Sequence, residues 1–354
     1  MDKTASYLLI ISAGLLVIYS ALIIYVWFFR YFSDLTTNKE KGNLERMFSR
    51  ILKVTNNETV NFGNIKEVQE LMSFVKGSGS RKESLINIII NYEDDFIETN
   101  HPLLMNLCEV TEIKSYLIKR LTSKSSFKKS LACRQLGILK LENTAKYIRK
   151  LSYCKDKDVR YNVFLTLAKL GNLEGIVDIL TKDYEDVHLS HRAVIEIISS
   201  FTGSKQELFQ KTLPLSDDYV RGVLIKAAAQ YKIEGLRDYY IKYLKSEDKN
   251  LRIACIRALC DLKNSNNEEY IINMLYDKQW EVRAAAAKSL QTIGTSSSFV
   301  ALAKTAGDSE WWVRHNAACT LILLNGGKEY ATNIINSKDK YAKEAVENAI
   351  EMIS

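Results

Sequence analysis

A basic residue recurs through the C-terminal two thirds of the chain at nearly constant spacing. The positions that carry it, called anchors below, lie 29 to 31 residues apart. Self-similarity at such a period is typical of repeat arrays, and it constrains the fold strongly because each repeat packs only on its neighbours. The anchors are Lys129, Arg160, His191, Arg221, Arg252, Arg283, Arg314 and Lys343.

The residues around each anchor predict an α-helix with one apolar face. Positions one before and three, seven and ten after the anchor are mostly apolar, and for the anchor Arg283 they are Val282, Ala286, Leu290 and Ile293. These offsets fall on one side of a helix with 3.6 residues per turn. In the last copy, Glu347 replaces the apolar residue that most copies place four after the anchor. A polar face there is expected of a terminal repeat that has no further neighbour.

Each gap between anchored helices is predicted to hold a second, more polar helix, as over residues 269–277 and 299–308. Since one such unit cannot bury its apolar face alone, stacked units bury a continuous core. The sequence therefore predicts an all-α fold, an α-solenoid of about eight 31-residue helix–turn–helix repeats. Short polar side chains are expected to cap the anchored helices, namely Asp217, Ser246, Asp277, Asp308 and Ser337.

Residues 277–294 follow the pattern D-x4-V-R-x2-A-A-x3-L-x2-I-G, and residues 308–325 nearly do so. This pattern resembles the short HEAT repeat of the kind named after phycobilin lyases, and the resemblance extends over residues 111–354. It implies a scaffold or an adaptor, or more rarely an enzyme. It also implies that the anchor arginine bonds an acidic residue of a neighbouring repeat, which would make a structural ladder of Arg160, Arg221, Arg252, Arg283 and Arg314.

Residues 5–29 contain no charged side chain. As a helix they would extend roughly 37 Å, enough to cross a hydrocarbon core of about 30 Å. The run is too long for a typical signal-peptide core, so we expect an uncleaved transmembrane helix that contacts the lipid bilayer. Basic residues follow the span, which predicts a short N-terminus outside and a cytoplasmic repeat domain. They are Arg30, Lys39, Lys41, Arg46, Arg50 and Lys53.

Residues 30–60 form a juxtamembrane segment with an amphipathic pattern. Leu44, Phe48 and Ile51 share one helical face, whereas Arg46 and Arg50 point away from it. Such a helix either lies on the lipid surface or packs on the following domain, and the sequence leaves both alternatives open. Residues 61–110 are helical but out of phase with the repeat, and we expect them to form an N-terminal cap before the solenoid of residues 111–354.

The three tryptophans of the repeat region are candidate partner-binding residues. Trp280 and Trp311 lie three residues before their anchors, a place where other repeats have lysine or aspartate, so we expect them and Trp312 to be exposed. The alternative is that their rings pack over neighbouring turns.

A basic stripe is predicted five residues after the anchors, where it is interrupted by Glu196. The alternative for this stripe is a merely solvated charged face. The stripe residues are Arg134, Lys226, Arg257 and Lys288.

Catalysis, a cofactor and a metal site have little support in the sequence. The four histidines, His101, His188, His191 and His315, form no HExxH motif, and the six cysteines form no CxxC pair. We therefore expect a non-enzymatic scaffold that binds a partner protein at the membrane, and we hypothesise a bacterial envelope or polysaccharide-assembly complex as its setting. A lyase-like enzyme acting on a bound chromophore and a nucleic-acid-binding protein are the alternatives, and the net charge of +7 makes nucleic acid the less favoured partner.

Overall fold

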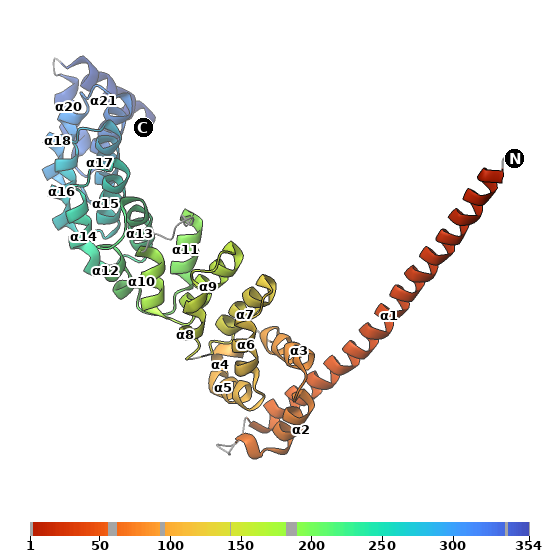
Figure 1. Ribbon diagram of the computed structural model, residues 1–354. Coiled ribbons are helices and arrows are strands. Elements are labelled where there is room, and N and C mark those ends of the chain that lie inside the picture. Colours follow the sequence, from red (N-terminus) through yellow and green to blue (C-terminus); the bar gives the residue numbers. More distant parts are fainter. Residues whose placement is uncertain are drawn as a thin grey trace. The chain divides into compact units, whose positions relative to one another are not determined.

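The computed structural model describes residues 3–55, 62–92, 96–141, 143–181, 190–336 and 339–353, apart from the side chains of residues 3–11, 32–36 and 55. These residues form helices and short 3-10 turns and contain no strand, which confirms the predicted all-α fold (Figure 1). The chain divides into two compact units, Met1–Tyr147 and Ile148–Ser354. The predicted cap Ser337 and the histidine His188 lie outside the described residues.

The N-terminal unit begins with one continuous helix, α1 (Lys3–Thr55), of 53 residues. Its segment Ser12–Tyr31 is long and apolar enough to cross a membrane, and none of that segment is buried within the structure. A core helix of a water-soluble domain would be covered by other helices, so this exposure is the feature that favours a membrane span. The described side chains at its C-terminal end include Trp27 and Tyr31, whose rings stack at 5.7 Å.

The juxtamembrane part of α1 packs on protein rather than offering its apolar face to lipid. Leu44, Phe48 and Ile51 are fully buried, and this part of α1 contacts α2 (Lys66–Val75) and α3 (Gly79–Ile90). Burial of one such side chain contributes about 2 kcal/mol, so the three together fix the helix on the unit. Of the two alternatives that the sequence left open, the structure thus supports packing on the following domain.

Short helices complete the N-terminal unit, and residues 77–78 form the turn between α2 and α3 where the sequence GSGS begins. An ion pair connects α1 to α3, since Arg81 Nε and Nη2 donate to Glu40 Oε1 at 3.1 and 2.8 Å. The remaining helices are α4 (Phe96–Thr99), α5 (His101–Val110), α6 (Ile113–Leu121) and α7 (Ser126–Ile138), with α8 (Ala145–Ile148) at the junction.

The C-terminal unit is a stack of helix pairs. The anchored helices contact one another in sequence, and from α13 onward each also contacts the shorter helix that precedes it, which gives two rows (Figure 1). The anchored row is α9 (Lys157–Lys169), α11 (His191–Ser200), α13 (Asp218–Gln230), α15 (Lys249–Asp261), α17 (Trp280–Ile293), α19 (Trp311–Leu323) and α21 (Lys340–Ile353). The shorter helices are α10 (Leu173–Thr181), α12 (Lys205–Thr212), α14 (Arg237–Tyr243), α16 (Glu268–Met274), α18 (Phe299–Thr305) and α20 (Gly327–Ile335).

The apolar frame predicted from the spacing is the core of this stack. Every described residue three positions after an anchor is buried, among them Val163, Leu224, Ala286 and Val346. Small residues at this position let neighbouring helices approach closely. Glu347 in the last copy is exposed, as expected for a polar terminal face.

Two anchor arginines reach an aspartate of the next repeat. Arg252 Nε and Nη2 lie 2.8 Å from Asp277 Oδ2 and Oδ1, and Arg283 makes the same bidentate pair with Asp308 at 2.7 and 2.9 Å. The side chains of Arg252 and Asp277 are 4% and 9% exposed, so this pair is largely shielded from water. Burial disfavours ionisation of Asp308, but the Arg283 hydrogen bond and the Glu310 N–H outweigh it and leave the pKa of Asp308 below its ordinary value.

Arg221 and Arg314 do not form the ladder contact that was predicted for them. Arg221 pairs with Asp218 of its own helix and donates to the carbonyl oxygen of Leu213 at 2.9 Å, because the corresponding position of the next repeat is Ser246 rather than aspartate. Arg314 donates to the carbonyl oxygens of Asp308 and Ser309 at 2.9 Å. Its guanidinium lies 5.1 Å from the Tyr341 ring centroid, and no ion pair of the described residues includes it.

The position of the helix caps also differs from the prediction. Asp217 caps α13 as expected, by accepting the Val220 N–H at 2.7 Å. Helix α15 is capped by Asp248 and not by Ser246. Asp277 and Asp308 lie two residues before their N-cap positions, which are Gln279 and Glu310, and each accepts the backbone N–H of that residue. These aspartates therefore hold the turn rather than the first helical residues.

We expect Asp277→Asn to lower the free energy of unfolding by about 3 kcal/mol, because it leaves the Arg252 guanidinium buried without a countercharge. Asparagine keeps the side-chain oxygen that accepts the Gln279 N–H, so the substitution removes the ion pair and retains the turn. Asp248→Asn is the matched control, since Asp248 caps α15 without an arginine partner among the described ion pairs. Urea unfolding of the full-length protein in detergent measures both, and equal destabilisation by the two substitutions would contradict the prediction.

Candidate functional site

Aromatic side chains begin two neighbouring anchored helices. Trp280 starts α17, and Trp311 and Trp312 start α19. Their exposed fractions are 37%, 51% and 57%, which confirms the exposure expected from the spacing. Large apolar side chains in such exposed positions are enriched at protein–protein contacts.

Trp311 and Trp312 form a compact aromatic cluster with His315. The two indole rings meet edge to face with their centroids 4.7 Å apart, and the His315 ring stacks on Trp311 at 4.9 Å and 9°. The stack follows from the helix, because residues four apart share one face. Among the described residues, Trp280 makes no ring contact with this pair, although it begins the neighbouring anchored helix α17.

Three tyrosines extend this surface, and the sequence reasoning missed them. Tyr219 on α13 and Tyr341 on α21 occupy the place of Trp312, two residues before the anchor, and are 56% and 59% exposed. Tyr276, in the turn before α17, is also exposed, with Lys304 Nζ 5.2 Å from its ring centroid. Comparison of that one frame position across the repeats would have found Tyr219 and Tyr341. We call this surface the aromatic edge, and it consists of Tyr219, Tyr276, Trp280, Trp311, Trp312 and Tyr341.

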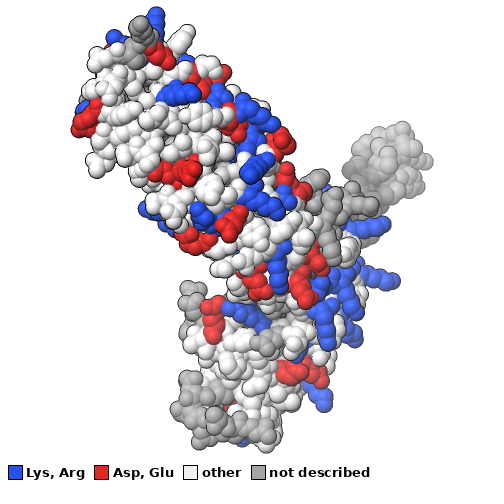
Figure 2. All heavy atoms as spheres, turned by 90° about the vertical axis from the view of Figure 1, so that its left-hand side faces the viewer, with Lys and Arg blue, Asp and Glu red and all other residues white. Residues whose placement is uncertain are grey.

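Three of the four predicted basic residues lie on successive anchored helices of the C-terminal unit. Lys226, Arg257 and Lys288 are exposed on α13, α15 and α17. Within the part of the chain that the structure describes, none of them is paired with a carboxylate. In the C-terminal unit, the upper part of Figure 2, lysine and arginine side chains gather toward one edge while much of the remaining face is uncharged.

The fourth basic residue and the acidic interruption lie on other helices. Arg134 is exposed on α7 and belongs to the N-terminal unit. Glu196 on α11 is exposed and accepts a hydrogen bond from the Tyr161 hydroxyl. Burial, reinforced by that carboxylate, raises the pKa of Tyr161 to about 12. The structure therefore places Lys226, Arg257 and Lys288 on neighbouring helices, whereas Arg134 belongs to the other unit.

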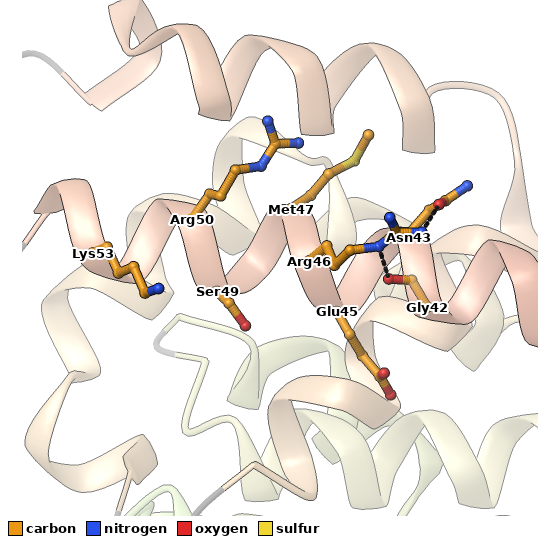
Figure 3. A pocket seen from close by; sticks show the side chains of 8 residues that line it. All are labelled: Gly42, Asn43, Glu45, Arg46, Met47, Ser49, Arg50 and Lys53. Atoms are coloured by element: carbon orange, nitrogen blue, oxygen red, sulfur yellow. Dashed lines mark hydrogen bonds between the residues drawn. The ribbon is translucent and has the colours of Figure 1, made fainter.

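The polar flank of α1 carries a further basic surface. Gly42, Arg46, Met47, Arg50 and Lys53 border a shallow hollow to which no other helix contributes (Figure 3). Arg46 is held along its own helix, since Nη2 donates to Asn43 Oδ1 at 2.7 Å and Nε to the Gly42 carbonyl at 3.2 Å. An open helix flank of this kind has no walls to enclose a ligand, so we do not include it in the candidate site.

The structure shows the surroundings of the cysteines and of His101, which the sequence analysis considered as candidates for chemistry. All six cysteines are free, and burial raises the pKa of Cys108 and of Cys260 to about 12, which keeps both thiols protonated and weakly nucleophilic. The His101 ring lies 3.2 Å from the Lys140 carbonyl oxygen. In the described residues, no three histidine, cysteine, aspartate or glutamate side chains are grouped so that they could hold a metal ion.

Comparison with known proteins supports the repeat assignment. A model of HEAT repeats matches residues 238–322 and 268–350. Among solved structures, the chain is similar to the CpcE–CpcF complex of phycocyanin lyase from Nostoc sp. PCC7120, with 13% identity over 84% of this chain and 98% of that chain and a TM-score of 0.22. It is also similar to an engineered protein, with 19% identity over 67% and 94% of the two chains and a TM-score of 0.19. Likenesses at such TM-scores support no inference about activity, and no curated protein matches the chain.

We expect Trp312→Ala to change the free energy of unfolding by no more than about 0.5 kcal/mol, because the ring is largely in water. Leu321→Ala on the same helix removes a fully buried side chain and is expected to cost about 3 kcal/mol. Thermal and urea unfolding of the two variants provide the comparison. A loss at Trp312 as large as that at Leu321 would mean that the indole is part of the packing and not a free surface.

Proposed function

Because the C-terminal part of this chain is an array of HEAT repeats, we propose that the protein is a membrane-anchored scaffold that binds a partner protein. Helical repeat arrays present long surfaces on which a partner can be bound through many separate contacts. The aromatic and cationic residues singled out above do not make up a set of acid, base and nucleophile. We therefore propose binding without catalysis, in a bacterial envelope or polysaccharide-assembly complex.

The observation that carries this proposal is the aromatic edge. Trp311 and Trp312 contact each other and His315, so their rings are held in one orientation although more than half of each is exposed. Tryptophan is enriched among the residues that dominate binding energy at interfaces. A ring that is already held also loses little conformational freedom when a partner covers it.

The exposed cations of the C-terminal unit indicate which charge to expect on the partner. Lys226, Arg257 and Lys288 are exposed on three successive helices without carboxylate partners in the described chain. Unpaired charges of one sign steer and orient a partner of the opposite sign more than they tighten its binding. The partner that fits is a protein with an acidic segment beside an apolar or aromatic one.

The proposed anchor is the apolar part of α1. Ser12–Tyr31 is exposed over its whole length in the structure, and a bilayer would remove this apolar surface from water. The following residues carry an excess of lysine and arginine, which favours the cytoplasmic side for the repeats. The proposed arrangement is a single pass with the N-terminus outside.

Capture from native membranes tests the binding surface. A partner crosslinked to the full-length protein is expected to be lost from the variant Trp280→Ala, Trp311→Ala, Trp312→Ala. The control variant Tyr270→Ala, Val300→Ala removes exposed side chains of the shorter helices in the same repeats and is expected to retain the partner. Capture that survives in the tryptophan variant would exclude the aromatic edge as the contact, and equal loss in both variants would mean that neither surface is specific.

Topology is testable by itself in intact cells. With one epitope tag fused at each end of the chain, externally added protease is expected to remove the N-terminal tag and to leave the C-terminal tag intact. After the membrane is permeabilised, both tags should be cleaved. Cleavage of the C-terminal tag in intact cells would overturn the proposed orientation.

A further inference from the structure

A hollow of about 550 Å³ lies in the N-terminal unit, between the start of α3, helix α6 and the start of α7. Its size falls in the range of sites that hold small molecules. Four cationic side chains border it, namely Lys82, Lys119, Arg120 and Lys128, and one carboxylate, Glu112. It includes no anchor residue and no residue of the aromatic edge, and the proposed scaffold function makes no use of it.

Two of the four cations are held in place by carboxylates. Lys82 is buried and its Nζ lies 2.9 Å from Glu112 Oε2. Arg120 pairs with Glu83 and donates from Nη1 to the Tyr116 hydroxyl at 3.0 Å. Fixed side chains lose little freedom on binding, so these two are arranged in advance to receive a ligand.

The other two cations carry charge that is not paired within the described residues. Across the described chain, neither Lys119 nor Lys128 has a carboxylate partner. The hollow therefore gathers four positive charges against the carboxylates of Glu112 and Glu83. Such an excess of positive charge in a concave surface concentrates anions there.

Hydrogen-bond donors also face this hollow. Ser78 and Ser123 border it, and each hydroxyl oxygen accepts a backbone N–H, from Arg81 at 3.3 Å and from Ser125 at 3.2 Å. Each hydroxyl proton remains able to donate. Gly79 at the start of α3 belongs to the first turn of a 12-residue helix, whose N–H groups have no acceptor within the helix.

From these features we infer that the hollow binds a small phosphorylated anion. Lysine ammonium groups, an arginine guanidinium, serine hydroxyls and a helix start together supply the charge and the donors that a phosphoryl group requires. A free metabolite and a lipid headgroup share this chemistry. About 20 Å of helix separates Tyr31, the end of the apolar segment, from Leu44, the first described side chain of α1 that is buried. Because this exceeds the screening length of about 8 Å in physiological salt, the surface charge of a bilayer is screened over that distance.

Calorimetric titration of the full-length protein with inorganic pyrophosphate tests the inference. Saturable binding at one site is expected, with at least a tenfold lower affinity in the variant Lys119→Ala, Lys128→Ala. Both lysines lie at the rim without ion-pair partners, so the folding of this variant is expected to be preserved and is checked by circular dichroism. The matched control Lys226→Ala, Lys288→Ala removes two positive charges from the C-terminal unit and should bind as the wild type does. Absence of saturable binding, or an equal loss in the two variants, overturns the site.

Reconstitution distinguishes the two sources of the phosphoryl group. The wild type and the Lys119→Ala, Lys128→Ala variant are placed in nanodiscs of phosphatidylcholine, with or without phosphatidylglycerol, and titrated again. Pyrophosphate affinity of the wild type that is equal in the two discs supports a soluble ligand. Loss of affinity in the anionic discs that is larger for the wild type than for the variant supports a lipid headgroup in the same site.

Discussion

A bidentate pair between a guanidinium and a carboxylate joins consecutive repeats in the middle of the C-terminal unit. Arg252 and Asp277, like Arg283 and Asp308, are nearly shielded from water, so each charge would be costly without the other. The same aspartates accept the N–H that begins the next anchored helix. Each aspartate thus fixes both the approach of the preceding repeat and the turn in its own repeat. A shift of that repeat or of that turn would leave a charge or a hydrogen-bond donor without its partner.

This constraint explains why the exposed aromatic residues are ordered. The turn held by each aspartate leads directly into the first residues of α17 and α19, where the tryptophans lie. Because those turns are tied to the preceding repeat, the tryptophan backbone positions are set by the buried part of the array. A binding surface on loops would be free to vary in length and conformation, whereas the spacing of these tryptophans is set by the repeat period of the buried core.

Helical periodicity allowed the core and the exposure of the three tryptophans to be predicted, because a fixed offset from the anchor fixes the side of the helix. It could have predicted more, since Ser246 in the place of Asp277 already indicates that Arg221 lacks its countercharge. The packing of Leu44, Phe48 and Ile51 was not predictable, because lipid and protein cover an apolar face equally well. Nor was the hollow beside Lys82, which residues from 77–82 and from 112–128 form together.

The continuity of α1 has a geometric consequence for any membrane-bound assembly. One unbroken helix runs from the apolar segment to residues buried against α2 and α3. The face of α1 that packs on the folded unit is therefore at a fixed rotation, about the helix axis, from any given face of the apolar segment. Each residue of an α-helix turns that angle by about 100° and lifts the unit by about 1.5 Å. The number of residues between Tyr31 and Leu44 therefore determines how the N-terminal unit is rotated about the membrane normal, and thus which of its surfaces faces a neighbouring protein.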